Sequence, residues 1–177
     1  MTTPPVTDLS GRFLAFCAEV TAFTVFDLYG TGQAASYLET VVRVVGEGLL
    51  TELLDAYDRA GAAGGAGGPA GGAAGADRQA RTTALEAEVF SDEKLGPIAR
   101  NIIKLWYVGV WYELPPDWND SFGALVNDGT FTASPAAYPE GLLWRAIGAN
   151  PPGAHGPGYG SWAQPPRIPP IPGDETP

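Results

Sequence analysis

The sequence predicts a small, mainly α-helical body followed by a long, extended C-terminal arm. Apolar residues recur at steps of three and four over much of residues 1–149, which is the spacing of helices with one buried face. Many of the 24 glycines and 17 prolines gather in two segments, 61–76 and 150–177. Because 177 residues support one core, we expect about five helices in a single body, residues 1–149, and an arm over residues 150–177.

The first helix is expected to begin at Thr7 or Asp8, either of which can cap its N-terminus. It should run to about Leu28 and end at Gly30, where glycine weakens the helix. Its buried face is marked by apolar residues at helical spacing: Leu9, Phe13, Phe16, Val20 and Phe23.

The next helical pattern starts at Gln33 and is weakened by Gly46 and Gly48. Its apolar period is present before and after these glycines: Leu38, Val41, Val42 and Val45, then Leu49, Leu50, Leu53, Leu54 and Tyr57. The pattern predicts either a separate third helix or a bent continuation of the second.

Residues 61–76 contain only glycine, alanine and one proline. Such side chains bury too little surface to offset the entropy of ordering the backbone. We expect a flexible insertion, which as a random coil of this length would span roughly 20–24 Å.

Helix is expected again at about Asp77–Phe90, and Pro97 is suited to the first position of the helix that follows. The inward side of that next helix is predicted to be Ile98, Ile102, Leu105 and Trp106. The aromatic run Leu105–Tyr112 indicates a packing centre or an interface.

After Leu114 the chain is expected to be rich in loops. Pro115-Pro116 should end any helix, a short strand is expected near Gly129–Thr132, and Tyr138–Ile147 should form one or two helical turns. Half of the residues from Asn150 to the C-terminus are proline or glycine, so this arm is expected to lie along another surface and to form no core of its own.

The charge of −10 argues against binding to nucleic acid or attachment to an anionic membrane, because both need clustered cations. No apolar run is long enough to insert into a membrane. The single cysteine, Cys17, is expected to be a buried apolar residue, so neither a disulfide nor a thiolate metal cluster is predicted.

No catalytic, cofactor or metal site is predicted. His155 is the only histidine, and most carboxylates fall on polar helix faces. Gly30–Ala35 matches a loose dinucleotide-binding fingerprint. That motif needs a strand before its glycines, but the apolar residues before Gly30 have helical spacing. A helix-to-helix turn is therefore favoured, and a nucleotide- or flavin-binding enzyme is kept as the alternative. Pro165–Pro172 keeps open a third reading, a helical scaffold whose tail binds a proline-recognising groove.

Four segments carry a family resemblance. Phe13–Leu38 and Ile102–Val110, the latter containing Trp-Tyr-Val-Gly, resemble the small subunit of membrane-bound, FAD-containing sorbitol, fructose and glucose dehydrogenases. Tyr138–Trp144 resembles the family's tyrosine-to-tryptophan segment, and Gly158–Trp162, followed by Pro165-Pro166, resembles its Gly-x-x-Trp and proline ending. The common order of these segments makes the resemblance specific.

The resemblance implies a non-catalytic accessory subunit without a cofactor of its own. The large subunit, of the glucose-methanol-choline oxidoreductase type, would hold FAD and the sugar or polyol, and a multihaem cytochrome often accepts the electrons. The expected interface residues are aromatic: Trp106, Tyr107, Trp111, Tyr138, Trp144, Tyr159 and Trp162. For Trp106 and Trp111 the alternative is a place in the chain's own core. Family members are typically periplasmic and carry a twin-arginine leader; this sequence begins without one, which leaves cytoplasm and periplasm both open.

Overall fold

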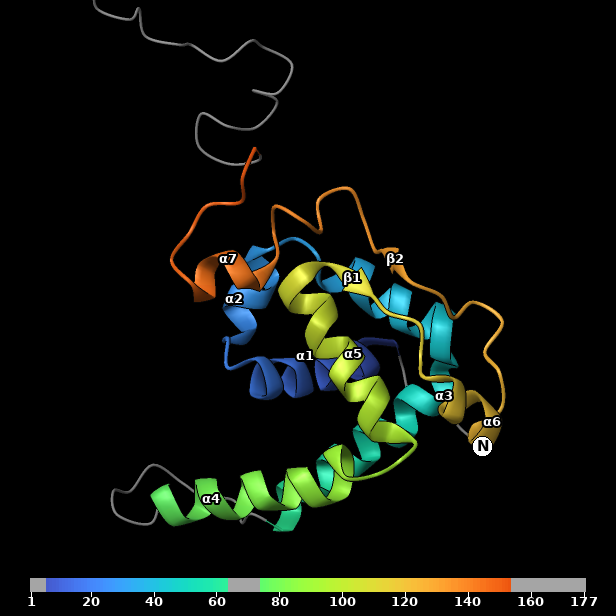
Figure 1. Ribbon diagram of the computed structural model, residues 1–177. Coiled ribbons are helices and arrows are strands. Elements are labelled where there is room, and N and C mark those ends of the chain that lie inside the picture. Colours follow the sequence, from blue (N-terminus) through green and yellow to red (C-terminus); the bar gives the residue numbers. More distant parts are fainter. Residues whose placement is uncertain (1–5, 64–73, 154–177) are drawn as a thin grey trace, which may run out of the picture.

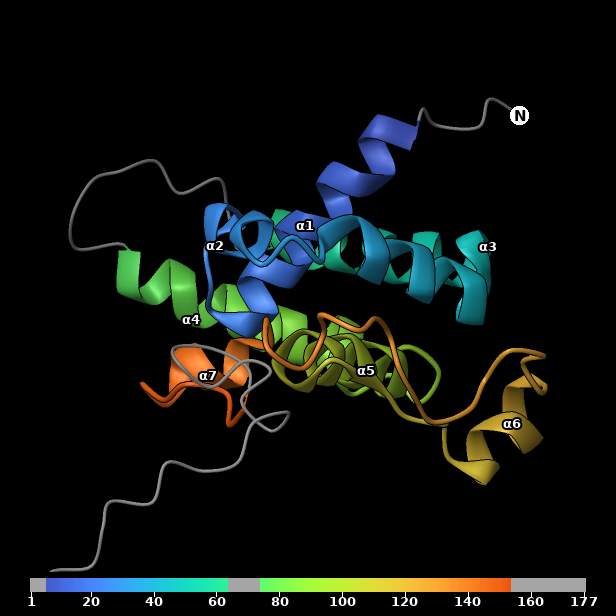
Figure 2. The same cartoon turned by 90° about the horizontal axis from the view of Figure 1, so that it is seen from above.

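Helix α5 lies at the centre of a mainly helical fold, where α1, α3 and α7 pack against it, while α4 packs along α3 (Figures 1 and 2). The computed structural model describes residues 6–63 and 74–153. These residues form seven α-helices, one π-helical turn (η1) and one two-stranded sheet. In chain order the elements are α1 (Val6–Thr21), α2 (Val25–Gly30), α3 (Ala34–Ala63), α4 (Ala74–Leu85), η1 (Glu86–Phe90), α5 (Leu95–Val108), β1 (Val110–Trp111), α6 (Pro116–Phe122), β2 (Phe131–Thr132) and α7 (Leu142–Ala146).

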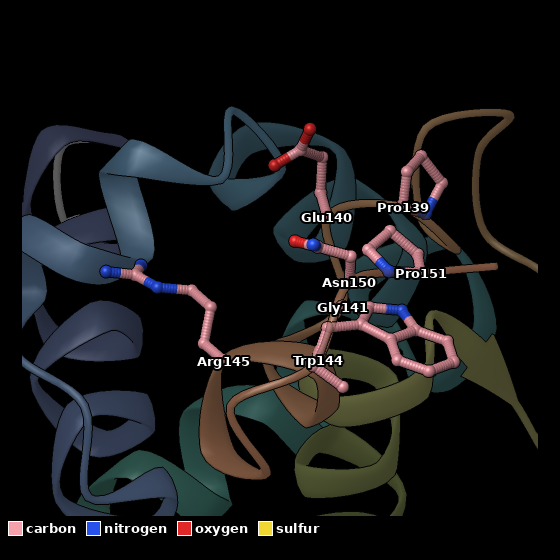
Figure 3. A pocket seen from close by; sticks show the side chains of 8 residues that line it. Pro139, Glu140, Gly141, Trp144, Arg145, Asn150 and Pro151 are labelled. Atoms are coloured by element: carbon pink, nitrogen blue, oxygen red, sulfur yellow. The ribbon is translucent and has the colours of Figure 1, made fainter. Parts of the chain in front are cut away.

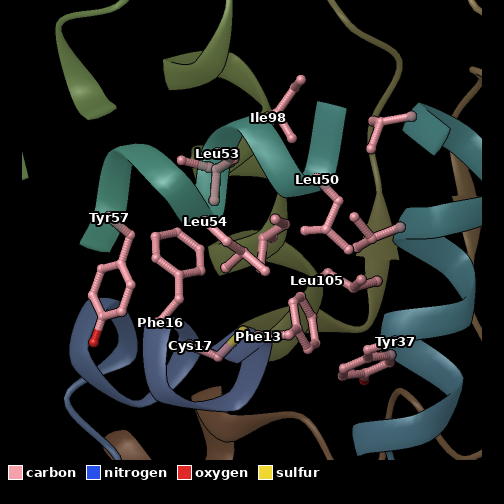
Figure 4. Close-up of a cluster of buried hydrophobic side chains, with 14 of the residues drawn as sticks. Phe13, Phe16, Cys17, Tyr37, Leu50, Leu53, Leu54, Tyr57, Ile98 and Leu105 are labelled. Carbon is pink, nitrogen blue, oxygen red and sulfur yellow. The ribbon is translucent and has the colours of Figure 1, made fainter. Parts of the chain in front are cut away.

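The core forms where α1, both halves of α3 and α5 meet. Figure 4 shows Phe13 and Phe16 of α1 facing leucines of α3 and the inner side of α5. The side chains predicted to line the inner side of α5 are all fully buried: Ile98, Ile102, Leu105 and Trp106. The predicted apolar character of Cys17 is confirmed, and burial raises the pKa of its thiol.

The single helix predicted up to Leu28 is in fact two helices, α1 and α2. Ala22 has a left-handed backbone (φ 61°), which ends α1 after Thr21. Thr24 then starts a new helix with a capping box: its hydroxyl accepts from the backbone N–H of Asp27 (3.1 Å), and the Asp27 carboxylate accepts from the backbone N–H of Thr24 (3.1 Å). The spacing of the apolar residues does not reveal this break, because the same spacing continues through residues 22–24.

The strain at Ala22 predicts an unusual effect of glycine. A non-glycine residue in the left-handed region costs about 1–2 kcal/mol, whereas glycine costs about 0.5–1 kcal/mol of additional backbone entropy. Ala22→Gly should therefore raise the free energy of unfolding, by about 0.5 kcal/mol, in urea denaturation. The control Ala15→Gly, at an exposed position inside α1, should lower it by about 1 kcal/mol. Equal losses at both positions would contradict the described backbone.

The predicted weakness at Gly46 is confirmed as a break inside α3. Gly46 has φ 82° and ψ 158°, outside the helical region, so α3 consists of two helices joined at this residue. The break lets α3 change direction, and both halves contribute buried residues to one core, including Tyr37 and Val41 before it and Leu50 and Leu53 after it.

Helix α4 continues into η1, in agreement with the helix predicted over 77–90. Because α3 extends to Ala63 and α4 begins at Ala74, both helices reach into the segment predicted as an insertion; residues 64–73 lie outside the described part of the chain. Helix α4 packs along α3 (Figure 1).

One half-buried ionic network joins α4 to α1 and α3. The Arg81 guanidinium donates two hydrogen bonds to the Glu19 carboxylate and one to the Tyr57 hydroxyl (3.1 Å), and Tyr57 donates to Glu19 (3.0 Å). The Arg81 hydrogen bonds hold the pKa of Glu19 below its usual value, while burial and the Glu19 charge raise the pKa of Tyr57 to about 12.

This network predicts a pH-dependent stability difference. Glu19→Gln should lower the free energy of unfolding by about 1 kcal/mol near neutral pH, because it replaces a charge-assisted pair with a neutral hydrogen bond. The pKa of Glu19 is lower in the folded state than in the unfolded state. The difference in free energy of unfolding between wild type and Glu19→Gln should therefore be largest above the unfolded pKa of about 4.3, and it should disappear as the pH falls through the folded pKa. Glu88→Gln, in an exposed pair with Arg59, should change stability by less than about 0.5 kcal/mol. A stability difference between wild type and Glu19→Gln that stays constant with pH would contradict the network.

Gly109 directs the chain out of α5 into the sheet. It has φ 72°, and a Cβ atom there would lie 2.6 Å from the Cβ and carbonyl oxygen of Ala137. Only glycine fits this close approach in this conformation. After it, β1 pairs antiparallel with β2, with Trp111 opposite Phe131, which confirms the strand predicted near residues 129–132.

The prediction that Pro115-Pro116 ends a helix is wrong. These prolines start α6: Pro115 is the N-cap and Pro116 the first helical residue. At that position the missing N–H of proline costs no helical hydrogen bond. The turns predicted within 138–147 are confirmed as α7.

Candidate functional site

Trp106 and Trp111 lie in the chain's own core. Both side chains are fully buried. The Trp106 ring packs edge-on against Tyr37 (4.9 Å between centroids), and the Trp111 indole N–H donates to Asp128 (2.9 Å). This corrects the expectation that the two tryptophans contact a partner, and the core placement kept as the alternative is the one observed. Trp106 is buried because α1, α3 and α7 cover α5. Trp111 lies in β1, which pairs with β2 and packs against α5.

Tyr107 connects α5 to the end of α1. Its hydroxyl donates to the Thr21 carbonyl (2.9 Å), and its ring meets Phe23 edge-on (6.2 Å). The side chain is half-buried, so only part of it remains accessible to a partner.

Tyr138 and Trp144 come together at the surface. Their rings pack edge-on at 5.3 Å, and the Trp144 indole N–H donates to the Tyr138 carbonyl (2.7 Å). The exposed Tyr138 also donates from its hydroxyl to the Pro152 carbonyl (3.2 Å), which places the start of the predicted arm beside this pair. Tyr159 and Trp162 lie outside the described residues.

Among the residues that the structure describes, the most exposed aromatic side chains are not among those predicted from the sequence. On α2, Phe26 is 85% exposed and Tyr29 is 59% exposed. They are three residues apart and therefore share one face of the helix, next to the partly exposed Val25, while Leu28 anchors the opposite face in the core. The capping box Thr24-Val-Phe-Asp27 was the available signal, since it restarts the helical phase after Ala22.

Helices α2 and α7 are linked by Arg145. The guanidinium pairs with Asp27 of α2 (2.8 Å) and lies 5.8 Å from the centre of the Phe23 ring. Figure 3 shows Arg145 reaching from α7 toward α2. Hydrogen bonds from Thr24, with the Arg145 pair adding to them, lower the pKa of Asp27, so this link is charged at neutral pH. We name the exposed apolar residues of these two helices and the adjoining turns, together with the half-buried Trp144, the α2–α7 surface: Val25, Phe26, Tyr29, Tyr138, Trp144 and Ile147.

A small pocket of about 180 Å³ adjoins this surface (Figure 3). Trp144 and Arg145 form one side, and Pro139, Glu140, Asn150 and Pro151 complete most of the lining. Sites for drug-sized molecules and cofactors usually measure about 300–1,000 Å³. The pocket is therefore better suited to a single side chain of a partner than to a dinucleotide or flavin.

The Gly30–Ala35 segment is a helix-to-helix turn, as the sequence analysis favoured. It joins α2 to α3, whereas the dinucleotide motif requires a strand before the glycines. The Thr31 hydroxyl donates to the Leu28 carbonyl (2.7 Å) and accepts from the Gln33 N–H (3.1 Å). The turn is thus held by its own hydrogen bonds.

Within residues 6–63 and 74–153, no three His, Cys, Asp or Glu side chains are grouped so that they could hold a metal ion. No helix in that same part of the chain is long and apolar enough to cross a membrane. His155 lies outside it.

Compared with protein-family models, with curated proteins and with solved structures, the chain gives no match.

Proposed function

We propose that this chain is a non-catalytic accessory subunit that binds and stabilises the FAD-containing catalytic subunit of a sugar or polyol dehydrogenase and helps it to mature. The observation that supports a binding role is the exposed α2–α7 surface. The dehydrogenase as partner rests on the ordered resemblance of four segments to the small-subunit family. FAD would be held by the large, glucose-methanol-choline-type subunit, and a multihaem cytochrome would take up the electrons.

The α2 face has the properties of an interface anchor. Burying a large apolar side chain contributes about 1.5–3 kcal/mol, and aromatic residues dominate the energetics of many interfaces. Phe26 is almost fully exposed on a short helix whose cap, ion pair and buried Leu28 hold it in place. A partner therefore meets a side chain that loses little backbone freedom when it binds.

The resembling segments have distinct places in the structure. The Trp-Tyr-x-Gly run combines a core residue, Trp106, with the left-handed Gly109 that closes against Ala137. This segment thus builds the body. The segment Tyr138–Trp144 ends on the exposed side, beside α2 and the start of the arm. On this proposal the first segment maintains the fold and the second contributes to the interface.

The test is co-expression with a large glucose-methanol-choline-type subunit from the same genome, followed by affinity pull-down and a flavin absorbance spectrum. A yellow, stoichiometric complex whose dye-linked sugar oxidation falls when this chain is omitted is expected. Flavin bound to this chain alone, or no complex with any such subunit, would overturn the proposal.

A point variant tests the surface. Phe26→Ser should weaken the complex at least tenfold, equivalent to about 1.4 kcal/mol, because it removes the most exposed aromatic anchor. The matched control is Val126→Ser, at an apolar residue that is 98% exposed in the segment between α6 and β2. Complex yields are compared after circular dichroism has verified that both variants are folded. Equal weakening by both variants, or by neither, would exclude the α2–α7 surface as the main contact.

A further inference from the structure

A second candidate surface lies at the other end of the body, where α6 packs on the start of α5. It is a groove of about 360 Å³, lined mainly by Pro97, Pro115, Trp118 and Phe122, with Glu93 and Asp117 at its edge. We name it the α6 groove. In both ribbon views α6 and α7 lie at opposite ends of the body (Figures 1 and 2), so the α6 groove is separate from the α2–α7 surface.

The apolar lining is held in a fixed arrangement. The Trp118 indole N–H donates to the Lys94 carbonyl (2.8 Å), which joins α6 to the N-terminus of α5. Phe122 packs against the Trp118 ring at 5.4 Å between centroids and remains 40% exposed. Trp118 is itself only 4% exposed, so Phe122, Pro97 and Pro115 provide most of the accessible apolar lining. Aromatic residues line the grooves that bind proline-rich segments in the polyproline II conformation.

The edge of the groove selects for a cation. Glu93 and Asp117 are exposed, and among the described residues neither has an ion-pair partner. The nearby cation, Lys94, is paired with Glu52 (2.6 Å). A proline-rich ligand with one basic residue would therefore match both the lining and the edge.

The chain itself contains such a ligand. Residues 165–172 read Pro-Pro-Arg-Ile-Pro-Pro-Ile-Pro, with Arg167 as the single charge. The last described residue, Gly153, follows α7, and residues 154–164 would have to cross to the opposite end of the body. The twelve steps from Gly153 to Pro165 reach at most roughly 40–43 Å when fully extended, which is about the diameter of a folded domain of this length, about 40 Å. A path within one molecule would have no slack, whereas a second molecule has no such limit.

We propose that the α6 groove binds the proline-rich segment 165–172 of a second copy of this chain, with Arg167 placed between Glu93 and Asp117. Two copies can exchange these segments reciprocally and form a closed dimer. The groove lies at a different end of the body from the α2–α7 surface, although the tail includes Pro165-Pro166, which belongs to the family resemblance. The dimer is tested on this chain alone, so its failure is distinguishable from a failure of the dehydrogenase proposal.

The test is sedimentation equilibrium of the full chain over a range of concentrations, with charge reversals on each side. The wild-type chain should dimerise reversibly. The groove variant Glu93→Lys/Asp117→Lys and the tail variant Arg167→Glu should each dimerise at least tenfold more weakly. An equimolar mixture of the two variants should regain the dimer, because each groove then meets a tail of opposite charge. Glu93 and Asp117 are both exposed, but Asp117 lies in the first turn of α6, where a negative charge is favourable. Circular dichroism therefore has to verify that the groove variant is folded.

Phe122→Ala provides a second, uncharged test and should also weaken the dimer, while Val126→Ser should leave it unchanged. A wild-type chain that stays monomeric at all concentrations would overturn the proposal. So would a dimer that is insensitive to both charge reversals, or variants whose mixture does not regain the dimer.

Discussion

The structure depends on the burial of one face of α5. Ile98, Ile102, Leu105 and Trp106 are fully buried there, and α1, α3 and α7 all contact this helix. Truncating such a residue to alanine typically costs about 2–5 kcal/mol, which is comparable to much of the stability of a small domain. The break in α3 at Gly46 is one consequence, because it lets both halves of α3 contribute buried residues to the same core.

Covering α5 also decides which aromatic residues are left for a partner. Trp106 and Trp111 are fully buried inside the body, where they stabilise the fold. On the α2–α7 surface, a cap and an ion pair hold Phe26 and Tyr29 of α2 in place. Tyr138, in the turn before α7, packs edge-on against Trp144. Because Phe26 is exposed, it can be changed without opening the core.

The long elements could be predicted from periodicity, whereas the turns and the exposed face could not. The inward residues of α5 and the weakness at Gly46 follow directly from spacing and from glycine's conformational freedom. The break at Ala22 was missed because the apolar period continues through it, and Pro115-Pro116 was read as a helix end although proline is equally suited to a helix start. Aromatic character alone could not separate Trp106 from Phe26, since burial depends on which neighbours cover each residue.

Hydroxyl-radical footprinting of the purified chain tests this separation of core and surface most directly. Modification rates, corrected for the intrinsic reactivity of each residue type, report solvent access at individual side chains. The account predicts rapid modification of Phe26 and Tyr29 and strong protection of Trp106 and Trp111. Tryptophans modified as readily as Phe26 would contradict it, because the aromatic run of α5 would then be a surface and the α2 face would lose its distinct role.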